Sequence, residues 1–580
     1  MKKLLSFFVL FFFLLLISAS ATRAQENSPT SYDITYKIKE DGSVNVLFKI
    51  GIENTTSNYY TSSYTLEVGF EDMTNIAASD ANGAIAPEIS KTNLGQQIKL
   101  NFNSRVVGKG NKLNFNLSFD TRDIAKKQGN IWEINIPGLS EKKGYDAFDV
   151  RVKVPPVFGN PIYVKPETAL NDLNFTKEEL GKSGISITFG NSQIYSFNLK
   201  YHIKNSNLFP IKTEIALPPT TNYQDVLIED INPKPLNVKK DKDGNWLATY
   251  FLMPSEKRHV FVKGKAKLAL YPKKQALSQS EQIEYLKEKP YWKISNEKII
   301  KLAKDLKTPG AIYEYVARSL TYDFSRITTD KPRLGAVDVL NNPTSAVCME
   351  FTDLFITLSR AAGIPAREVD GFAYTQNSKQ RPLSLVKDVL HAWPEYYDFK
   401  KQTWIMIDPT WGNTTGGVDY FNTLDFDHFA FVIRGISSEY PVPAGGYKFA
   451  GFENSKDVNV GFTDIFEDIN PSIDIQLDMQ NKFFSLMPVT GNITLINKKS
   501  VMFPSQILTI RTASLDPKER NITTEEIPPN GTIKIPVVFE KGSFFDIKKA
   551  IIEFRINDKA IYQTIDISPL NFFSLFKFNK

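Results

Sequence analysis

The chain has 580 residues, of which 42% are apolar and 23% are charged. This balance is typical of globular proteins rather than disordered ones, and the length exceeds that of one ordinary domain. The 70 basic and 64 acidic residues are spread along the chain without a block of like charge, and no nucleic-acid-binding motif is present. The sequence therefore predicts several packed domains and argues against nucleic acid as a partner.

The N-terminus has the pattern of a secretory signal. Two lysines are followed by an apolar run from Leu4 to Ile17, broken by one serine, and then by small residues. We expect cleavage after Ala21, with Ala24 as second choice, and assign residues 1–24 to the signal peptide. An uncleaved membrane anchor is the alternative, although the run is shorter than the roughly 17 to 25 residues that span a bilayer. We therefore expect an exported protein, located outside the cytoplasm or at the cell surface. Association with the cell envelope is one arrangement that this localisation allows.

Cys348 is the only cysteine in the chain. An exported protein with one cysteine cannot form an internal disulfide, and a free thiol in an oxidising compartment is a liability unless it is buried or used. The alternative interpretation is an inert residue, because a free cysteine usually behaves as a small buried hydrophobe. The surroundings of this residue must decide between the two.

Alternation of apolar and polar residues dominates the chain after the signal. Residues 32–50 alternate on either side of an Asp-Gly turn, which is typical of a β-hairpin with one buried face. Similar alternation continues to about residue 270, with a break near residue 160. We expect two β-sandwich-like domains, residues 25–157 and 158–272.

The pattern changes after Pro272. Helical periodicity appears, and we expect a mixed α+β domain over residues 273–450. One of its helices has Thr308 as N-cap and Pro309 at the first helical position. The three helices expected first in this domain cover residues 278–286, 295–306 and 309–320.

Alternation returns in the C-terminal part, residues 465–580, which predicts a third β-sandwich. The fold class is therefore multidomain: a β-sandwich-like N-terminal region, an α+β core and a C-terminal β-sandwich. The segment 241–245 has the composition of a calcium loop, but its glycine comes too early and no closing glutamate follows. We interpret it as a hairpin turn.

Cys348 is expected in the first turn of a buried helix. The apolar residues that follow it are spaced as one helix face, and the pattern stops at Gly363. Unpaired backbone N–H groups and the positive end of the helix dipole favour an anion at this position. Such a position suits a thiolate nucleophile.

His391 and Asp408 lie on two expected strands joined by a polar turn. If Asp398 pairs with Thr403, His391 and Asp408 become diagonal neighbours on one face, roughly 7 to 8 Å apart at the backbone and within reach of a side-chain hydrogen bond. A shift of one residue in this register would put the two groups on opposite faces.

These three residue types supply what nucleophilic catalysis requires. The imidazole takes the thiol proton and later protonates a leaving amine, while the carboxylate fixes the tautomer and stabilises the imidazolium. Taken singly, His391 reads as a structural histidine and Asp408, before a proline, as a turn residue. The chain has only four histidines, however, and this one opens an alternating strand. We therefore predict a catalytic triad of Cys348, His391 and Asp408.

The motifs around these residues resemble those of the transglutaminase-like superfamily, in the expected order and over residues 294–440, about a quarter of the chain. Many relatives have glycine shortly before the cysteine, where this chain has Ala346. The motifs are Cys348-Met349-Glu350-Phe351, then Arg360-Ala361-Ala362-Gly363-Ile364-Pro365-Ala366-Arg367, then His391-Ala392-Trp393-x-Glu395, then Trp404, and finally Asp408-Pro409-Thr410-Trp411.

The resemblance implies a papain-like Cys-His-Asp core that forms a thioester with a carboxamide or peptide carbonyl and passes the acyl group to an amine or water. It implies a protein or peptide substrate. Some relatives are inactive, so a surface adhesion or scaffold protein is the alternative. No cofactor is expected, no metal-ligand cluster is visible because the few histidines are scattered, and the calcium that some relatives require has no convincing loop here.

Five further residues near the motifs receive structural interpretations. We expect Trp393 and Trp411 to be packing walls. Glu395 and Arg367 are expected to be structural or surface groups. Tyr322, at the end of an expected helix, is interpreted as a core residue, with a place near the oxyanion as the alternative.

Overall fold

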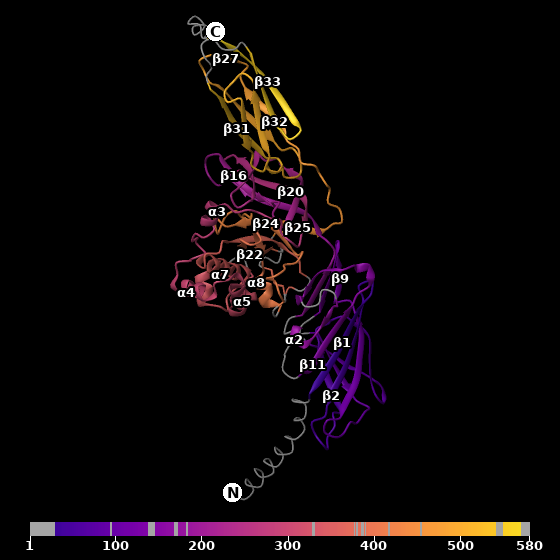
Figure 1. Ribbon diagram of the computed structural model, residues 1–580. Coiled ribbons are helices and arrows are strands. Elements are labelled where there is room, and N and C mark those ends of the chain that lie inside the picture. Colours follow the sequence, from indigo (N-terminus) through magenta and orange to yellow (C-terminus); the bar gives the residue numbers. More distant parts are fainter. Residues whose placement is uncertain are drawn as a thin grey trace. The chain divides into compact units, whose positions relative to one another are not determined.

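The chain divides into two compact units, residues 1–191 with the short segment 415–419, and residues 192–414 with 420–580. The signal expected at residues 1–24 lies outside the described residues. No described helix is long and apolar enough to cross a membrane. Figure 1 shows the computed structural model, which describes residues 29–92, 95–136, 145–167, 172–180, 184–327, 331–375, 378, 381–383, 388, 390–415, 418–452, 455–540 and 549–569.

The first unit is built from sheets. Its strands and short helices are β1 (Thr30–Ile38), β2 (Val44–Glu53), β3 (Ser63–Val68), β4 (Met73–Asp80), β5 (Gly83–Ile85), β6 (Glu88–Thr92), β7 (Gly95–Asn101), β8 (Lys112–Thr121), β9 (Ala125–Gln128), β10 (Ile131–Ile136), β11 (Tyr145–Lys153), η1 (Pro156–Phe158), β12 (Pro161–Lys165), β13 (Asn174–Phe175), α2 (Lys177–Leu180) and β14 (Ile185–Phe189). They form sheets in the orders β13-β11-β1-β2-β8-β4-β5, β12-β14-β10-β9 and β3-β7-β6.

The alternation read from the sequence explains how this unit folds. β1 and β2 form the expected antiparallel hairpin, with Ile38 opposite Val44 and Gly42 in the turn at a φ of 79°. Alternate residues of each strand are buried, and one apolar core joins residues of all three sheets, among them Leu117, Ile134 and Ile98.

The first unit continues past the boundary that the sequence suggests at 157/158. β14 pairs with β10 and with β12, and β13 pairs with β11, so residues up to Asn191 complete the same sheets. The position predicted for this boundary is therefore wrong. These pairings join strands far apart in sequence, which alternation alone does not reveal.

In the second unit, a strand-rich part precedes the α+β core. Its strands are β15 (Gln193–Lys204), β16 (Ile211–Leu217), β17 (Gln224–Asn232), β18 (Asn237–Lys240), β19 (Trp246–Leu252) and β20 (Lys257–Leu268), joined by the later β25 (Val458–Phe462). The sheets have the orders β17-β20-β15-β25 and β16-β19-β18. β25 lies beyond the range expected for the core and returns to pair with β15.

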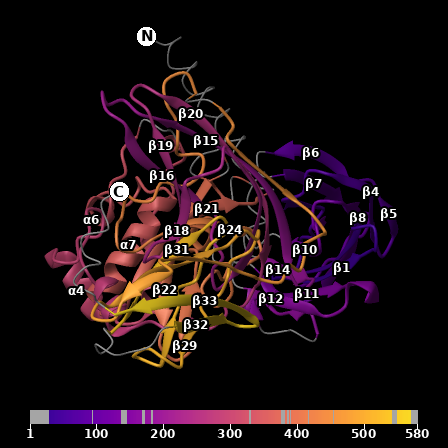
Figure 2. The same ribbon diagram turned by 90° about the horizontal axis from the view of Figure 1, so that it is seen from above.

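The core of the second unit has one four-stranded sheet, in the order β23-β22-β21-β24. Its elements are α3 (Gln279–Glu284), α4 (Glu297–Leu306), α5 (Pro309–Ser319), η3 (Phe324–Arg326), α6 (Ala336–Asn341), α7 (Cys348–Ala361), β21 (Ala366–Ala373), β22 (Leu390–Asp398), β23 (Thr403–Met406), α8 (Pro409–Thr414) and β24 (His428–Arg434). Figure 1 shows α7 beside this sheet, with α4 and α5 on the same side, and Figure 2 shows α4 and α7 from above.

Two helices, α5 and α7, begin where the sequence predicts, whereas α4 begins at Glu297, two residues later than expected. Thr308 caps α5 by accepting a hydrogen bond from the Ala311 N–H, and Pro309 is the first helical residue. α7 begins at Cys348 and ends at Ala361, just before Gly363 at a φ of 81°. Because its first residue is the lone cysteine, the thiol lies at the N-terminus of a buried helix.

The hairpin turn between β18 and β19 connects the strand-rich part to the core. The Asp243 carboxylate accepts hydrogen bonds from the backbone N–H groups of Gly435 and Ile436, both at 3.1 Å. The Asn245 side chain bonds both the N–H and the carbonyl oxygen of Ile433. This segment is the hairpin turn that the sequence predicts, and it holds the end of β24.

The C-terminal part of the second unit returns to strands. They are β26 (Asp474–Met479), β27 (Lys482–Phe484), β28 (Val489–Ile496), β29 (Ile507–Thr512), β30 (Glu519–Thr523), β31 (Thr532–Phe539), β32 (Lys549–Ile556) and β33 (Lys559–Ser568). They form sheets in the orders β26-β28-β31 and β27-β33-β32-β29-β30, which enclose a core of their own. The described chain is thus mostly β, with its larger helices confined to the core domain.

Candidate functional site

The start of α7 is fixed by side chains around Cys348. The Glu350 carboxylate accepts hydrogen bonds from the backbone N–H of Val347 at 3.0 Å and of Leu334 at 2.9 Å. The first N–H groups of a helix have no acceptor within it, so one of them is available at the thiol for an anion. Cys348 is fully buried, at 0% exposure.

The hairpin that carries His391 has the expected register. Asp398 pairs with Thr403 and Glu395 with Met406. The Ile407 N–H donates to the Pro394 carbonyl oxygen at 3.1 Å, which extends the same register. The diagonal relation predicted for His391 and Asp408 is therefore present, and their side chains meet.

His391 and Asp408 form a buried hydrogen bond. The distance between His391 Nε2 and Asp408 Oδ2 is 2.9 Å. The other ring nitrogen, Nδ1, is buried and has no hydrogen-bond partner among the described residues. Cys348 lies close enough to the ring to raise the pKa of His391. The structure thus brings the three predicted residues together, and Nδ1 is the nitrogen left for the thiol proton.

Asp408 is held in place by four donors. Its Oδ1 accepts hydrogen bonds from the backbone N–H groups of Thr410 at 2.8 Å and Trp411 at 3.0 Å, in the first turn of α8. Its Oδ2 contacts His391 and also Nε2 of His428, at 3.3 Å. The position of the carboxylate, and with it that of the His391 ring, is therefore fixed from several sides.

His428 is a functional-site residue that sequence reasoning missed. It is the first residue of β24, it is 1% exposed, and its Nδ1 lies 2.7 Å from Asp425 Oδ1. Imidazoles and carboxylates therefore alternate from His391 through Asp408 and His428 to Asp425. The run Asp425-Phe426-Asp427-His428 was present in the sequence, but only the sheet order brings His428 to Asp408.

A β-bulge interrupts the pairing of β21 with β24: Asp370 pairs with Val432 and Gly371 with Ala430, so the extra residue, Phe431, lies in β24. A Cβ atom at Gly371 would lie 2.0 Å from the carbonyl oxygen of Phe429, so the close approach of β24 requires glycine here. Bulges redirect the side chains that follow them. The extra residue changes the course of β24 close to His428, which pairs with Ala373.

The charges of this cluster reinforce one another. Burial lowers the pKa of His391, but Asp408 and Cys348 outweigh it and raise the pKa to about 9 from an ordinary 6.5. Burial likewise lowers the pKa of His428, yet Asp425 and Asp408 raise it to about 9. Burial would raise the pKa of Asp408, but the two histidines hold it well below its usual range. At neutral pH the carboxylate is therefore ionised and both imidazoles favour their protonated form.

Aromatic residues enclose the His391 ring. The Trp411 ring lies 5.1 Å from it and the Trp393 ring 6.1 Å, both nearly parallel to it. Trp393 and Trp411 are fully buried, which confirms the packing role predicted for them. They exclude water from the His391–Asp408 hydrogen bond, which strengthens it.

Tyr322 lies beside the start of α7. It forms a parallel bridge with Ala346, and its buried hydroxyl has no hydrogen-bond partner among the described residues. Burial and the nearby Cys348 raise the pKa of Tyr322 above its usual value. The hydroxyl therefore stays protonated and is a free donor close to the thiol.

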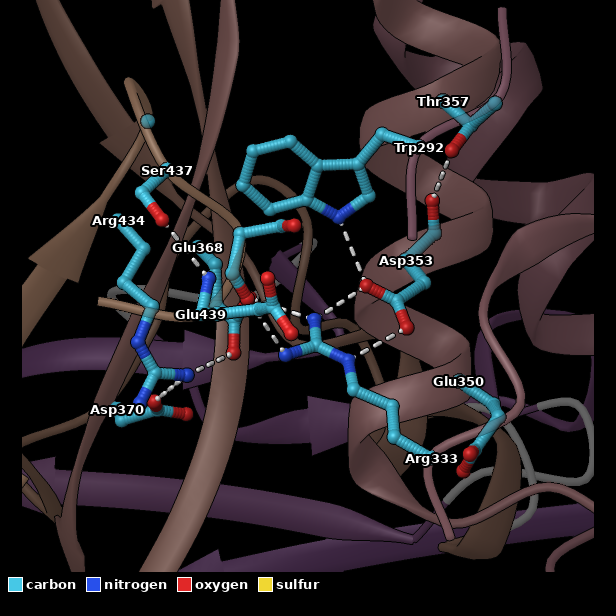
Figure 3. A network of polar contacts seen from close by, with 12 residues as sticks. Trp292, Arg333, Glu350, Asp353, Thr357, Glu368, Asp370, Arg434, Ser437 and Glu439 are labelled. Atoms are coloured by element: carbon cyan, nitrogen blue, oxygen red, sulfur yellow. Dashed lines mark hydrogen bonds and ion pairs between the residues drawn. The ribbon is translucent and has the colours of Figure 1, made fainter. Parts of the chain in front are cut away.

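A network of buried charges fixes α7 against the sheet (Figure 3). Arg333 donates to Asp353 of α7 at 2.9 Å and to Glu368 of β21 at 2.6 Å. Arg434 of β24 contacts Glu368 at 3.0 Å and Asp370 at 2.6 Å. Because β21 also pairs with β22, this network couples the helix that carries Cys348 to the sheet that carries His391.

Arg367 and Glu395 form a second buried ion pair, at 2.7 Å. The Arg367 guanidinium lies over the Trp404 ring, 4.0 Å from its centre. Both charged residues are 2% exposed. Of the two roles expected for them, structural or surface, the structural one is therefore correct.

One group of side chains could hold a metal ion. The ligand atoms of His391, Asp408 and His428 all lie within 4.8 Å of one another, and two imidazoles with a carboxylate suit a transition metal. Each of these ligand atoms is already engaged in a hydrogen bond. The donor set is therefore complete without an ion.

Comparison with known proteins finds a family model that matches part of the core domain, including Cys348, His391 and Asp408. Residues 294–409 match the family model of the transglutaminase-like superfamily. The chain is similar to the uncharacterized protein YebA of Bacillus subtilis (strain 168), with 30% identity over 111 residues, 18% of this chain and 15% of that protein. The chain thus spans a small part of that relative.

Two solved structures are also similar. One is a candidate cysteine protease from Cytophaga hutchinsonii, with 16% identity, a TM-score of 0.29, and coverage of 47% of this chain and 99% of that one. The other is red sea bream transglutaminase, with 11% identity, a TM-score of 0.19, and coverage of 63% and 81%. Scores this low support no argument about activity. The family model, however, confirms the resemblance read from the motifs: this chain carries a transglutaminase-like superfamily core at residues 294–409.

Proposed function

We propose that this protein is an exported cysteine enzyme that forms a thioester with a carboxamide or peptide carbonyl of a protein or peptide. The acyl group then passes to an amine or to water. The observation that carries the proposal is the His391–Asp408 hydrogen bond at 2.9 Å, which leaves Nδ1 free beside a thiol at a helix N-terminus. This arrangement meets the needs of an activated nucleophile.

The first half of the reaction follows from these contacts. Nδ1 of His391 holds the proton of the Cys348 thiol before the substrate binds, and the thiolate attacks the carbonyl carbon of the substrate. The carbonyl oxygen becomes an oxyanion, which the N–H groups at the start of α7 and the Tyr322 hydroxyl can stabilise. The imidazolium then returns its proton to the leaving nitrogen, the C–N bond breaks, and ammonia or an amine departs from the thioester.

The second half reverses the proton transfers. His391 takes a proton from the incoming amine or water, which attacks the thioester carbon. The C–S bond breaks, and the thiolate is again paired with the protonated imidazole. Asp408 stays ionised throughout and orients the ring. Cys348 is 0% exposed and His391 1%. The residues that bury the thiol must therefore move before a substrate can reach it.

The test is transfer of a tagged primary amine into a glutamine-containing protein, with ammonia release and peptide cleavage measured in parallel. Wild-type protein is expected to give at least one of these three products, and Cys348→Ala none. Cys348→Ser is the matched control for shape, because it keeps the size of the side chain while weakening the nucleophile. Equal products from wild type and Cys348→Ala, or none from either across varied substrates, would favour the non-catalytic scaffold instead.

A further inference from the structure

One end of the β15–β20 sheets presents an unusual surface. Two connections between the sheets meet there, residues 205–210 and residues 253–256. We call their three most exposed large apolar residues, Leu208, Phe209 and Met253, the apolar tip. Leu208 is 94% exposed, Phe209 63% and Met253 55%. Large apolar side chains gathered this way on a surface mark a contact with something else.

The apolar tip is held rigidly by Asn205, which is 2% exposed. Its side-chain amide donates to the carbonyl oxygens of Phe209 at 2.8 Å and Met253 at 3.0 Å, and so ties the two connections together. Its Oδ1 accepts from the Asn207 N–H at 2.9 Å. Leu208 and Phe209 therefore point into solvent from a fixed loop, not from a loose one.

Positive charges lie directly behind the apolar tip. Lys204 of β15 is the cross-strand partner of Lys257 of β20, and Lys212 of β16 is exposed beside Phe251. Like charges directly opposite each other destabilise a sheet. These three lysines have no acidic partner among the described residues, although the Lys257 amine lies over the Phe449 ring. We call these three lysines the basic collar of the tip. Their mutual repulsion is relieved when they face an anionic partner.

The apolar tip lies at the far end of its sheet from the core domain. Leu217 and Trp246 pair at one end of β16 and β19, next to the hairpin turn that bonds β24. Ile211 and Leu252 pair at the other end, next to the apolar tip. At roughly 3.3 Å per residue, the length of β16 separates the two ends by about 20 Å. A partner on the apolar tip would leave the core domain uncovered.

We propose that the apolar tip inserts into the surface of a lipid bilayer that contains anionic phospholipids. Leu208, Phe209 and Met253 would bury among the acyl chains, and the lysines behind them would meet the phosphate headgroups. Apolar side chains with a basic collar are the pattern of interfacial membrane binding. The bilayer is favoured over a protein partner because exposed apolar side chains on a fixed loop stand in front of lysines that have no acidic partner among the described residues, an arrangement that acyl chains and anionic headgroups complement together.

The test is flotation of the chain without residues 1–24 with vesicles of phosphatidylcholine, with or without phosphatidylglycerol. Wild-type protein is expected to bind the anionic vesicles more tightly than the neutral ones, and binding should weaken as salt rises. Leu208→Ser with Phe209→Ser should reduce affinity about tenfold or more. Lys204→Glu with Lys257→Glu should reduce it at least about fivefold on anionic vesicles alone.

Matched controls separate this from general surface effects. Ile551→Ser removes an exposed apolar side chain from β32, and Lys267→Glu reverses a charge at the opposite end of β20. Both are expected to bind like wild type. No binding of wild type to anionic vesicles, or equal binding of the tip variants, would overturn the proposal. So would a dimer in sedimentation that the tip substitutions abolish, since a second copy would then be the occupant.

Discussion

All four histidines of the chain lie in two pairs, and only one pair, which is fully buried, lies beside the thiol. His202 and His259 face each other across β15 and β20, with ring centres 4.7 Å apart, while His391 and His428 lie 5.6 Å apart. In each pair one Nε2 bonds an aspartate, Asp457 at 3.0 Å and Asp408 at 2.9 Å. These two bonds are alike, but in the second pair Nε2 of the other histidine, His428, also contacts the same aspartate, at 3.3 Å.

The two aspartates, Asp457 and Asp408, differ in their other hydrogen-bond and ion-pair partners. Asp457 also contacts the Lys448 amine at 2.9 Å and the Ser455 hydroxyl, so its charge is shared with a permanent cation. Asp408 has backbone N–H groups and two imidazoles as its partners. The negative charge of Asp408 therefore stabilises the protonated forms of two imidazoles rather than a permanent cation. The comparison shows that a buried His–Asp pair becomes a candidate catalytic pair through the thiol and the second histidine around it.

Replacing the first histidine of each pair should give the largest contrast. His391→Gln removes the base beside Cys348, and we expect thioester formation to fall about 10³-fold or more. His202→Gln should change it less than about twofold once the amount of folded protein is matched. Acyl transfer and the rate of Cys348 alkylation at pH 7.5 measure this. Similar losses in the two variants would contradict the separate roles assigned to the pairs.

The aspartates should separate the pairs next. Asp408→Asn keeps the shape of the side chain but removes the charge that fixes the imidazolium and its tautomer, so we expect about a 10²-fold loss of acyl transfer. Asp457→Asn leaves Lys448 and His202 with a neutral partner and should lower the thermal stability instead. Measuring transfer rate and unfolding temperature for both variants checks this. A stable but inactive Asp457→Asn protein would count against it.

His428 offers a smaller and more specific contrast. Its positive charge near His391 opposes protonation of that ring, so His428→Gln should move the basic limb of the pH profile of kcat/KM to higher pH. We expect the maximum rate to fall about tenfold, as for other residues that orient a functional group from behind. A purely structural role would lower the rate without moving the profile. His259→Gln, the matched control, should move neither.

Local chemistry was readable from the sequence around Cys348. Three features depend only on neighbours along the chain. They are the apolar spacing that places the cysteine at a helix start, the Thr308 cap, and the hairpin register that puts His391 and Asp408 on one face. Each was predicted and is present. Family resemblance supplied the order of these motifs.

Long-range contacts were not readable. His428 reaches Asp408 because β24 lies next to β21, and Arg333, just before α6, reaches Glu368 of β21. Neither contact produces a periodic pattern of apolar and polar residues from which it could be predicted. The first unit likewise extends to Asn191 because β14 pairs back onto β10. Sheet order, rather than propensity, decides such contacts.

The second histidines should finally differ in how they link stability to pH. The folded pKa of His428 is raised to about 9 from 6.5, so its protonation stabilises the folded state fully below pH 6.5, and this contribution is lost as pH rises through 9. Relative to His428→Gln, wild type should therefore lose at most about 3 kcal/mol of unfolding free energy over that range. Chemical denaturation of both proteins at several pH values measures the difference.

His259 should behave in the opposite way. Burial, together with His202 and Lys200, lowers the pKa of His259 below 6.5, so the unfolded chain binds the proton more tightly. Relative to His259→Gln, wild type should gain stability as pH rises toward 6.5 and then change no further, and the gain should be the smaller of the two because this side chain is partly exposed. Slopes of the same sign for both histidines would show that Asp425 and Asp408 do not set the protonation of His428. Opposite slopes would tie the charge of the candidate site to those two carboxylates, and not to burial.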